Sequence, residues 1–144
     1  MPTVSRPVTN ATHGSIFLEQ FLDSRAQQQT KVRIAFGLVG DELEKLSLGR
    51  TNVTDAGLIH LKGLVELQLL YLDETKTSDV GLMNLKGLKQ LQDLDLRATK
   101  VSDTGLENFK GLTRLKSLNL QQTRVSDGAV RDLQRALPNC QIVY

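Results

Sequence analysis

The chain has 144 residues, a length typical of one domain that buries a core of its own. Its 18 lysines and arginines nearly balance 16 aspartates and glutamates, so no overall charge excess points to nucleic acid, an anionic membrane or an acidic substrate. A single cysteine, Cys140, excludes an internal disulfide, and no Cys/His cluster has the spacing of metal ligands. We therefore expect one domain without a metal or cofactor, whose electrostatic specificity is local.

The first residues, Met-Pro-Thr-Val-Ser-Arg-Pro, lack the apolar core of a signal peptide. No stretch approaches the roughly 18 apolar residues of a membrane span. These features favour a cytoplasmic protein that does not bind a membrane. A secreted protein is the alternative if a leader has been lost.

The N-terminal part of the chain divides into an arm and a cap. Residues 1–13 are rich in Pro, Thr, Ser and Asn, which is typical of a flexible arm. Residues 14–42 are predicted to form a helix from Ser15 to about Gln28, followed by an alternating strand over 32–36. Because the first strand of a stacked sheet has an open edge, this helix and strand are expected to cover it.

A 24-residue repeat occupies residues 43–139. The phrase Leu-x-x-Leu-x-Leu begins at four equally spaced positions, which are Leu43, Leu67, Leu91 and Leu115. In the first copy, Leu46 and Leu48 alternate with Lys45 and Ser47, which predicts a short strand with its leucines on one side. Repeats of this size cannot bury their leucines alone, so we expect them to stack in parallel around one core.

Each repeat continues into a predicted helix of about two turns. Thr or Ser stands before Asp at the expected helix starts, where a hydroxyl oxygen can accept an unpaired backbone N–H; these residues are Thr54, Ser78, Ser102 and Ser126. Leucines at spacings of three, such as Leu58 and Leu61, give one apolar face. The following Lys-Gly pairs predict a helix end with a left-handed glycine; they are 62–63, 86–87 and 110–111.

The last repeat departs from the pattern. Ala129 stands where the other repeats have Gly, and residues 136–139 replace the Lys-Gly-Leu phrase. Residues 140–144 are predicted to form a final capping strand that closes the sheet.

The phrase Val101-Ser102-Asp103-Thr104-Gly105-Leu106 resembles the V-[ST]-D-x-G-L signature of leucine-rich-repeat proteins, an abundant bacterial type related to the cysteine-containing subclass. Thr replaces the Asn or Cys usual after the strand. The resemblance covers residues 43 to about 139. It implies an α/β solenoid, with a curved parallel sheet on the concave face and short helices on the convex face. The family's roles run from adaptor to effector to receptor, so the resemblance implies binding without naming a ligand.

The solvent-facing strand positions of such a sheet are the candidate binding surface. Tyr71 with Asp73, Asp93 and Asp95 would place an aromatic ring inside an acidic cluster, which favours a partner with a basic residue. The alternative is a set of ordinary solvated side chains that pair with nearby arginines. The full predicted set is Arg50, Leu69, Tyr71, Asp73, Glu74, Asp93, Asp95, Arg97, Asn119 and Gln121.

Other signals are weaker. The lysines 62, 86 and 110 form a column that could bind phosphate, but a role at the helix ends explains them more simply. Few aromatic residues accompany them, which disfavours nucleic acid. His13 and His60 are isolated from any nucleophile, and Asp93 with Asp95 is interpreted as a solvated acidic patch instead of an acid–base pair or cation site.

The sequence therefore predicts a non-catalytic protein- or peptide-binding module, an adaptor or scaffold that uses its concave face. One alternative is a structural subunit that self-associates into a homo-oligomer. Another is a substrate-receptor or effector component of a larger assembly.

Overall fold

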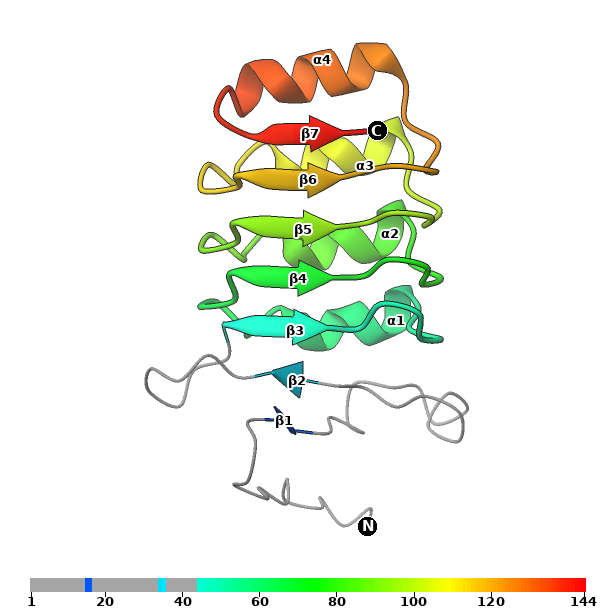
Figure 1. Cartoon of the computed structure of the whole chain (residues 1–144), viewed down its shortest axis with the longest axis vertical. Coiled ribbons are helices and arrows are strands. Elements are labelled where there is room, and N and C mark those ends of the chain that lie inside the picture. Colours follow the sequence, from blue (N-terminus) through cyan, green and yellow to red (C-terminus); the bar gives the residue numbers. More distant parts are fainter. Residues whose placement is uncertain (1–14, 17–33, 36–43) are drawn as a thin grey trace.

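A computed structural model of the chain describes residues 15–16, 34–35 and 44–144. Within the last range, five parallel strands lie side by side in chain order (Figure 1). They are β3 (Lys45–Ser47), β4 (Leu69–Tyr71), β5 (Asp93–Asp95), β6 (Ser117–Asn119) and β7 (Gln141–Val143). Neighbouring strands from β3 to β6 pair residues one repeat apart, so the predicted stack and its 24-residue register are confirmed.

Helical segments form a second layer behind the sheet (Figure 1). In the first three repeats, a short α-helix continues directly into a 3₁₀ turn, in line with the predicted two turns. These pairs are α1 (Asp55–Leu58) with η2 (Ile59–Leu61), α2 (Asp79–Leu82) with η3 (Met83–Leu85), and α3 (Asp103–Leu106) with η4 (Glu107–Phe109). The last repeat instead has one longer helix, α4 (Asp127–Ala136), which covers the C-terminal end of the stack.

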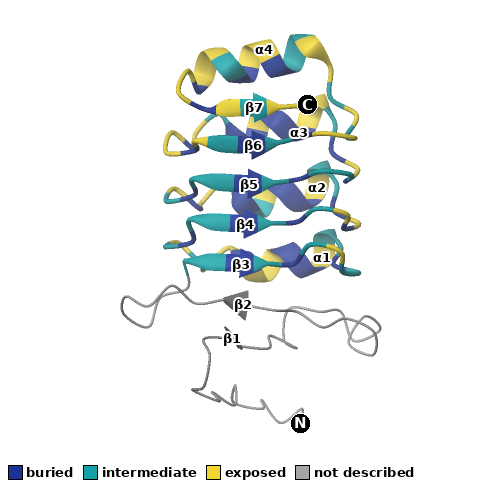
Figure 2. Cartoon of the chain, in the orientation of Figure 1, coloured by how far each residue is buried: buried dark blue, intermediate teal, exposed yellow. Residues whose placement is uncertain are grey.

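The core lies between the two layers. The middle residue of each of the first four strands is a leucine no more than 1 % exposed, and these are Leu46, Leu70, Leu94 and Leu118. Helical leucines such as Leu58 and Leu82 meet them from the other side and are fully buried. In Figure 2 the buried positions recur at the same place in strands β3 to β6, with half-buried positions on either side. Burial of each such leucine stabilises the fold by roughly 1.5–3 kcal/mol.

The helix starts were predicted at the right residues with the wrong hydrogen bonds. Thr54, Ser78 and Ser102 have the extended backbone of an N-cap, but their side chains accept no hydrogen bond from the helix. Ser126 alone of the predicted caps accepts one, from the Ala129 N–H at 3.3 Å. The predicted capping oxygen is therefore absent in three repeats.

The serines donate hydrogen bonds to the aspartate of the preceding repeat. Asp55 accepts the Ser78 N–H at 2.7 Å through Oδ1 and the Ser78 hydroxyl at 2.5 Å through Oδ2. The same pair of bonds joins Asp79 to Ser102 and Asp103 to Ser126. Hydrogen bonds to an ionised carboxylate are shorter and stronger than those between neutral groups. We call this series the Asp–Ser ladder.

The helix ends also differ from the prediction. Gly63, Gly87 and Gly111 do not adopt the left-handed backbone that was expected of them. The left-handed residues instead follow the strands and are not glycines, with φ between 54° and 58°; they are Arg50, Glu74, Ala98 and Gln122. Each is followed by a threonine whose hydroxyl donates to the carbonyl three residues earlier, as Thr75 does to Leu72 at 2.7 Å.

The described residues test only part of the predictions made for the N-terminal region. Ser15–Ile16 forms strand β1, antiparallel to β2 (Ile34–Ala35), so the predicted helix is wrong at Ile16 because its backbone pairs in a ladder. The predicted strand is confirmed at Ile34–Ala35, and β2 lies next to β3 (Figure 1). The arm at 1–13 and the rest of the predicted helix lie outside the described residues. At the other end, β7 confirms the capping strand.

Candidate functional site

The concave face carries the side chains that alternate with the core leucines. The register places Tyr71 between Ser47 and Asp95, with Asn119 one strand further. Leu69 and Asp93 are paired in the same way on the neighbouring row. These side chains are half-buried. The sheet therefore brings the predicted strand residues together on one surface.

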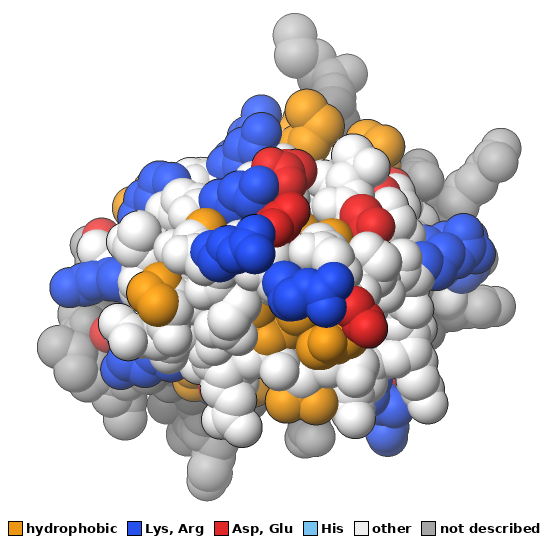
Figure 3. Space-filling model, turned by 90° about the horizontal axis from the view of Figure 1, so that it is seen from above, with side chains coloured by type: hydrophobic (Ala, Val, Ile, Leu, Met, Phe, Trp, Pro, Cys, Tyr) orange, Lys and Arg blue, Asp and Glu red, His pale blue; other side chains and the backbone are white. Residues whose placement is uncertain are grey.

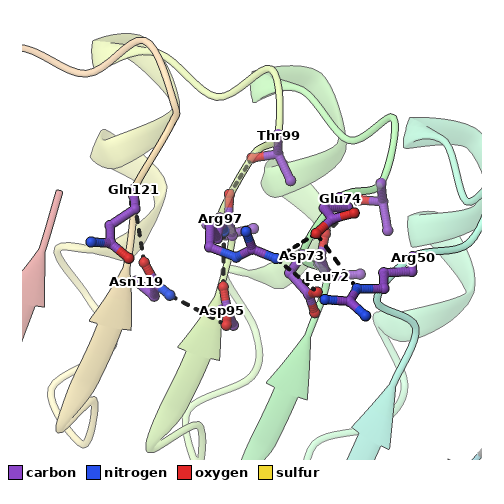
Figure 4. A network of polar contacts seen from close by, with 11 residues as sticks. Arg50, Leu72, Asp73, Glu74, Asp95, Arg97, Thr99, Asn119 and Gln121 are labelled. Atoms are coloured by element: carbon purple, nitrogen blue, oxygen red, sulfur yellow. Dashed lines mark hydrogen bonds and ion pairs between the residues drawn. The ribbon is translucent and has the colours of Figure 1, made fainter.

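Two arginines neutralise part of the predicted acidic cluster. The Arg97 guanidinium lies 2.5 Å from Glu74 and 3.8 Å from Asp73, and Arg50 lies 3.5 Å from Glu74 (Figure 4). Asp73 also packs over Gly49, where an added Cβ would lie 2.0 Å from the carboxylate Oδ1. The alternative interpretation, in which acids pair with nearby arginines, is thus correct for Asp73 and Glu74. The exposed ion pairs of Glu74 contribute at most about 1 kcal/mol each.

Asp95 and Asn119 shape the turns that follow their strands. Asp95 accepts the Arg97 N–H at 2.9 Å and a longer hydrogen bond, 3.4 Å, from the Asn119 side chain. Asn119 in turn accepts the Gln121 N–H at 3.1 Å, while the Gln121 side chain stays exposed. Both side chains use one oxygen to fix the local backbone, so only part of their hydrogen-bonding capacity remains for a ligand.

Asp93 differs from the other concave carboxylates. Among the described residues its side chain has no hydrogen bond and no ion pair. The charge of Asp93 changes the pKa of neighbouring groups. Burial raises the pKa of Tyr71, and the negative charges of Asp93 and then Asp95 raise it further. Burial, with Asp93 second, also raises the pKa of the Cys140 thiol to about 11. Asp93 is therefore a negative charge that this part of the chain leaves uncompensated.

Lys45 adds a contact that the sequence did not suggest. Its ammonium lies 5.5 Å from the centre of the Tyr71 ring, within the range of a cation–π interaction. The ring thus has a cation on one strand and acids on the other. Aligning the repeats would have revealed Lys45 and Tyr71 as close neighbours, since their positions differ by one repeat plus two residues.

The described residues offer no arrangement for metal binding, because no three His, Cys, Asp or Glu side chains in them are grouped as ligands. His60 lies on η2, in the helical layer, and His13 is outside the described residues. None of the helices in the described part of the chain is long and apolar enough to span a bilayer.

Comparison with solved structures identifies the fold. A leucine-rich-repeat protein of Leptospira interrogans superposes with a TM-score of 0.56 and 22 % identity, over 71 % of this chain and 25 % of that one. Internalin C2 of Listeria monocytogenes gives a TM-score of 0.48 and 20 % identity over 70 % of each chain. Internalin F of the same species gives 0.49 and 23 % identity over 69 % of this chain and 34 % of its own.

No protein-family profile matches the chain, and no curated protein is significantly similar to it. The chain spans only a quarter of the Leptospira protein. That likeness, together with the parallel sheet and its helical layer, shows a leucine-rich-repeat fold. The narrower bacterial V-[ST]-D-x-G-L subtype stays a prediction from the sequence.

Proposed function

We propose that the chain is a non-catalytic protein- or peptide-binding module, and that its concave sheet is the binding surface. A rigid stack of strands presents fixed rows of side chains, which suits recognition of a partner more than chemistry on a substrate. The partner is expected to carry a basic residue that contacts Asp93 beside Tyr71.

The observation that carries the proposal is the uncompensated charge of Asp93. Asp73 and Glu74 are paired with Arg97 and Arg50, whereas Asp93 has no such partner among the described residues. A cation brought to Asp93 would also lie near Asp95, its neighbour on the same strand face. The Tyr71 phenol, like any tyrosine at neutral pH, is protonated and can donate a hydrogen bond.

The size of the sheet limits the ligand. Five strands spaced about 4.8 Å apart make a face roughly 20 Å wide. A standard protein interface needs about 800 Å² from each partner. We therefore expect the concave face to hold a short segment of a partner, which binds in an extended or turn conformation.

The test is affinity capture from a lysate of the source organism with three folded proteins. These are the wild type, a double variant Tyr71→Ala with Asp93→Asn, and the control Asp132→Asn. The control removes the same negative charge from the exposed face of α4, where Asp132 pairs with Arg135. Thermal unfolding verifies that all three fold.

A partner retained by the wild type and the control but lost by the double variant would support the proposal. Equal capture by all three would move the site away from the concave face. Capture of further copies of the chain itself would favour the self-associating subunit.

A further inference from the structure

A second surface lies on the side of the molecule where the strands begin. Three equivalent segments, 59–68, 83–92 and 107–116, run from the 3₁₀ turns into the strands. They carry six cations and only two acids, Glu66 and Glu107. The cations define what we call the basic rim: Lys62, Lys86, Lys89, Lys110, Arg114 and Lys116. Figure 3, which looks down on the C-terminal end of the stack, shows Lys and Arg side chains along the left-hand side, where the strands begin, as well as at the centre and right.

Lys62, Lys86 and Lys110 stand at the C-caps of η2, η3 and η4, as the sequence suggested, but this role does not account for Lys89, Arg114 and Lys116. The glycines that follow Lys62, Lys86 and Lys110 are not left-handed. Within the described residues, the side chains of Lys62, Lys86 and Lys116 make no hydrogen bond or ion pair, and only Lys110 has an acidic partner, Glu107 at 2.6 Å. Most of the positive charge on the basic rim is therefore uncompensated.

Exposed apolar side chains continue the same surface on the helical layer. Ile59 and Met83 precede Lys62 and Lys86 by three residues, which places each pair on one helical face. Val80 precedes Met83 by the same interval. Ile59, Val80 and Met83, which we call the apolar stripe, are 53 %, 67 % and 58 % exposed.

The third repeat shows that the fold does not require this stripe. At the positions equivalent to Val80 and Met83 it has Thr104 and Glu107, and its helix has the same bounds relative to the repeat. Exposed apolar side chains that lie together and are rimmed by charged residues are typical of an interaction surface.

We propose that the basic rim and the apolar stripe together form a second docking surface, and that it binds an acidic amphipathic segment of a partner protein. Asp or Glu side chains of that segment would meet the lysines, while Leu, Ile or Phe side chains would cover Met83, Val80 and Ile59. Nucleic acid and anionic glycans offer charge without such apolar groups. The rim also has no exposed aromatic ring for base stacking, since Phe109 is buried and Tyr71 lies on the concave face.

The test is selection of short random peptides, displayed on phage, against the full chain. The enriched peptides are then measured by fluorescence anisotropy against three variants. Val80→Thr with Met83→Glu copies the third repeat and so retains a sequence that this fold accepts. Lys62→Gln with Lys86→Gln removes charge alone, and Tyr71→Ala with Asp93→Asn is a control on the concave face. Thermal unfolding verifies each fold.

We expect peptides rich in both acidic and large apolar residues, bound about tenfold more weakly by each of the first two variants and unchanged by the concave control. A lack of acidic peptides among those enriched, equal binding of these peptides by Val80→Thr/Met83→Glu, or no retained peptide would overturn the proposal. The proposal would also be overturned if heparin or single-stranded DNA bound more tightly than the peptides and equally to the wild type and to Val80→Thr/Met83→Glu. The surface would then recognise charge alone.

Discussion

Glycines in this chain have two different roles that the sequence alone does not separate. An added Cβ at Gly105 would lie 2.3 Å from Asp79 Oδ1 and 3.0 Å from a Leu82 methyl, and Gly81 is crowded in the same way by the repeat before it. At Gly63 and Gly87 nothing lies within 4 Å. The glycine of the V-[ST]-D-x-G-L phrase is thus needed because the Asp–Ser ladder passes over it.

A pair of alanine substitutions tests this difference. We expect Gly105→Ala to lower the free energy of unfolding by about 1–3 kcal/mol, since the new methyl must displace a hydrogen-bonded carboxylate. Gly87→Ala, in open space and with no left-handed backbone, should be neutral or stabilise by up to about 1 kcal/mol. Urea unfolding measures both. Equal losses in the two variants would contradict the assigned roles.

We expect Cys140 to lower the free energy of unfolding as the pH rises in the alkaline range. The folded pKa is about 11, above the value of 9.0 for a free thiol, so the folded state holds the proton more tightly. Its stabilising contribution is complete below about pH 9 and is lost as the pH rises towards 11, by an amount on the order of 2 kcal/mol. We expect the Cys140→Ala variant to lack this part of the decline. Urea unfolding at pH 8 to 11 compares the two proteins, and identical slopes would contradict the prediction.

Among elements, the hydrogen bonds that cross between repeats were the hardest to predict. The sequence identified Ser102 and Asp103 as a helix start, but the acceptor of Ser102 is Asp79, which lies 23 residues earlier. When one repeat is considered alone, the serine is expected to cap the helix of its own repeat. The left-handed turn residues were missed for a similar reason, because Glu74 and Ala98 are not residues that favour positive φ. Their N–H groups bond to the next repeat, Glu74 to Arg97 and Ala98 to Gln121, which holds the strained turn.

The ladder can be tested with two equivalent aspartates. Asp79→Ala leaves the Ser102 N–H and hydroxyl without their acceptor, and we expect a loss of about 2–3 kcal/mol in the free energy of unfolding. Asp127 occupies the same place in the last repeat and has no bond to a following serine. Asp127→Ala should cost less than about 1 kcal/mol, the value of a charge near a helix N-terminus. If chemical denaturation gave comparable losses in the free energy of unfolding for the two variants, the hydrogen bonds of the ladder would not stabilise the fold.

At the scale of the whole molecule, the repeat predicted the fold well and the site less completely. A strict period puts Leu46, Leu70, Leu94 and Leu118 into one row, so the parallel sheet and the core follow directly. The binding surface depends on which charges pair, and the pairing of Arg97 with Glu74 across 23 residues cannot be read from composition or spacing. The sequence left open whether the acids bind a partner or pair with arginines, and the structure separates the paired Asp73 and Glu74 from Asp93.

A continuous core implies that the repeats unfold together. The chain has two tyrosines and no tryptophan, so Tyr71→Phe leaves Tyr144 as a probe of the last repeat and Tyr144→Phe leaves Tyr71 as a probe of the second. Because neighbouring repeats share one core, we expect the fluorescence of each variant to follow its own far-ultraviolet circular dichroism through one urea transition. A probe that separates from the circular dichroism would show that the ends unfold independently.

The most direct test of the account is the dissociation constant of a captured partner, measured by isothermal titration calorimetry with the wild type, Asp93→Asn and Asp132→Asn. Both variants lose one negative charge, but only the first loses it on the concave face. We predict that Asp93→Asn weakens binding about tenfold or more and that Asp132→Asn leaves it unchanged. Equal affinities for all three proteins would contradict recognition through the concave face.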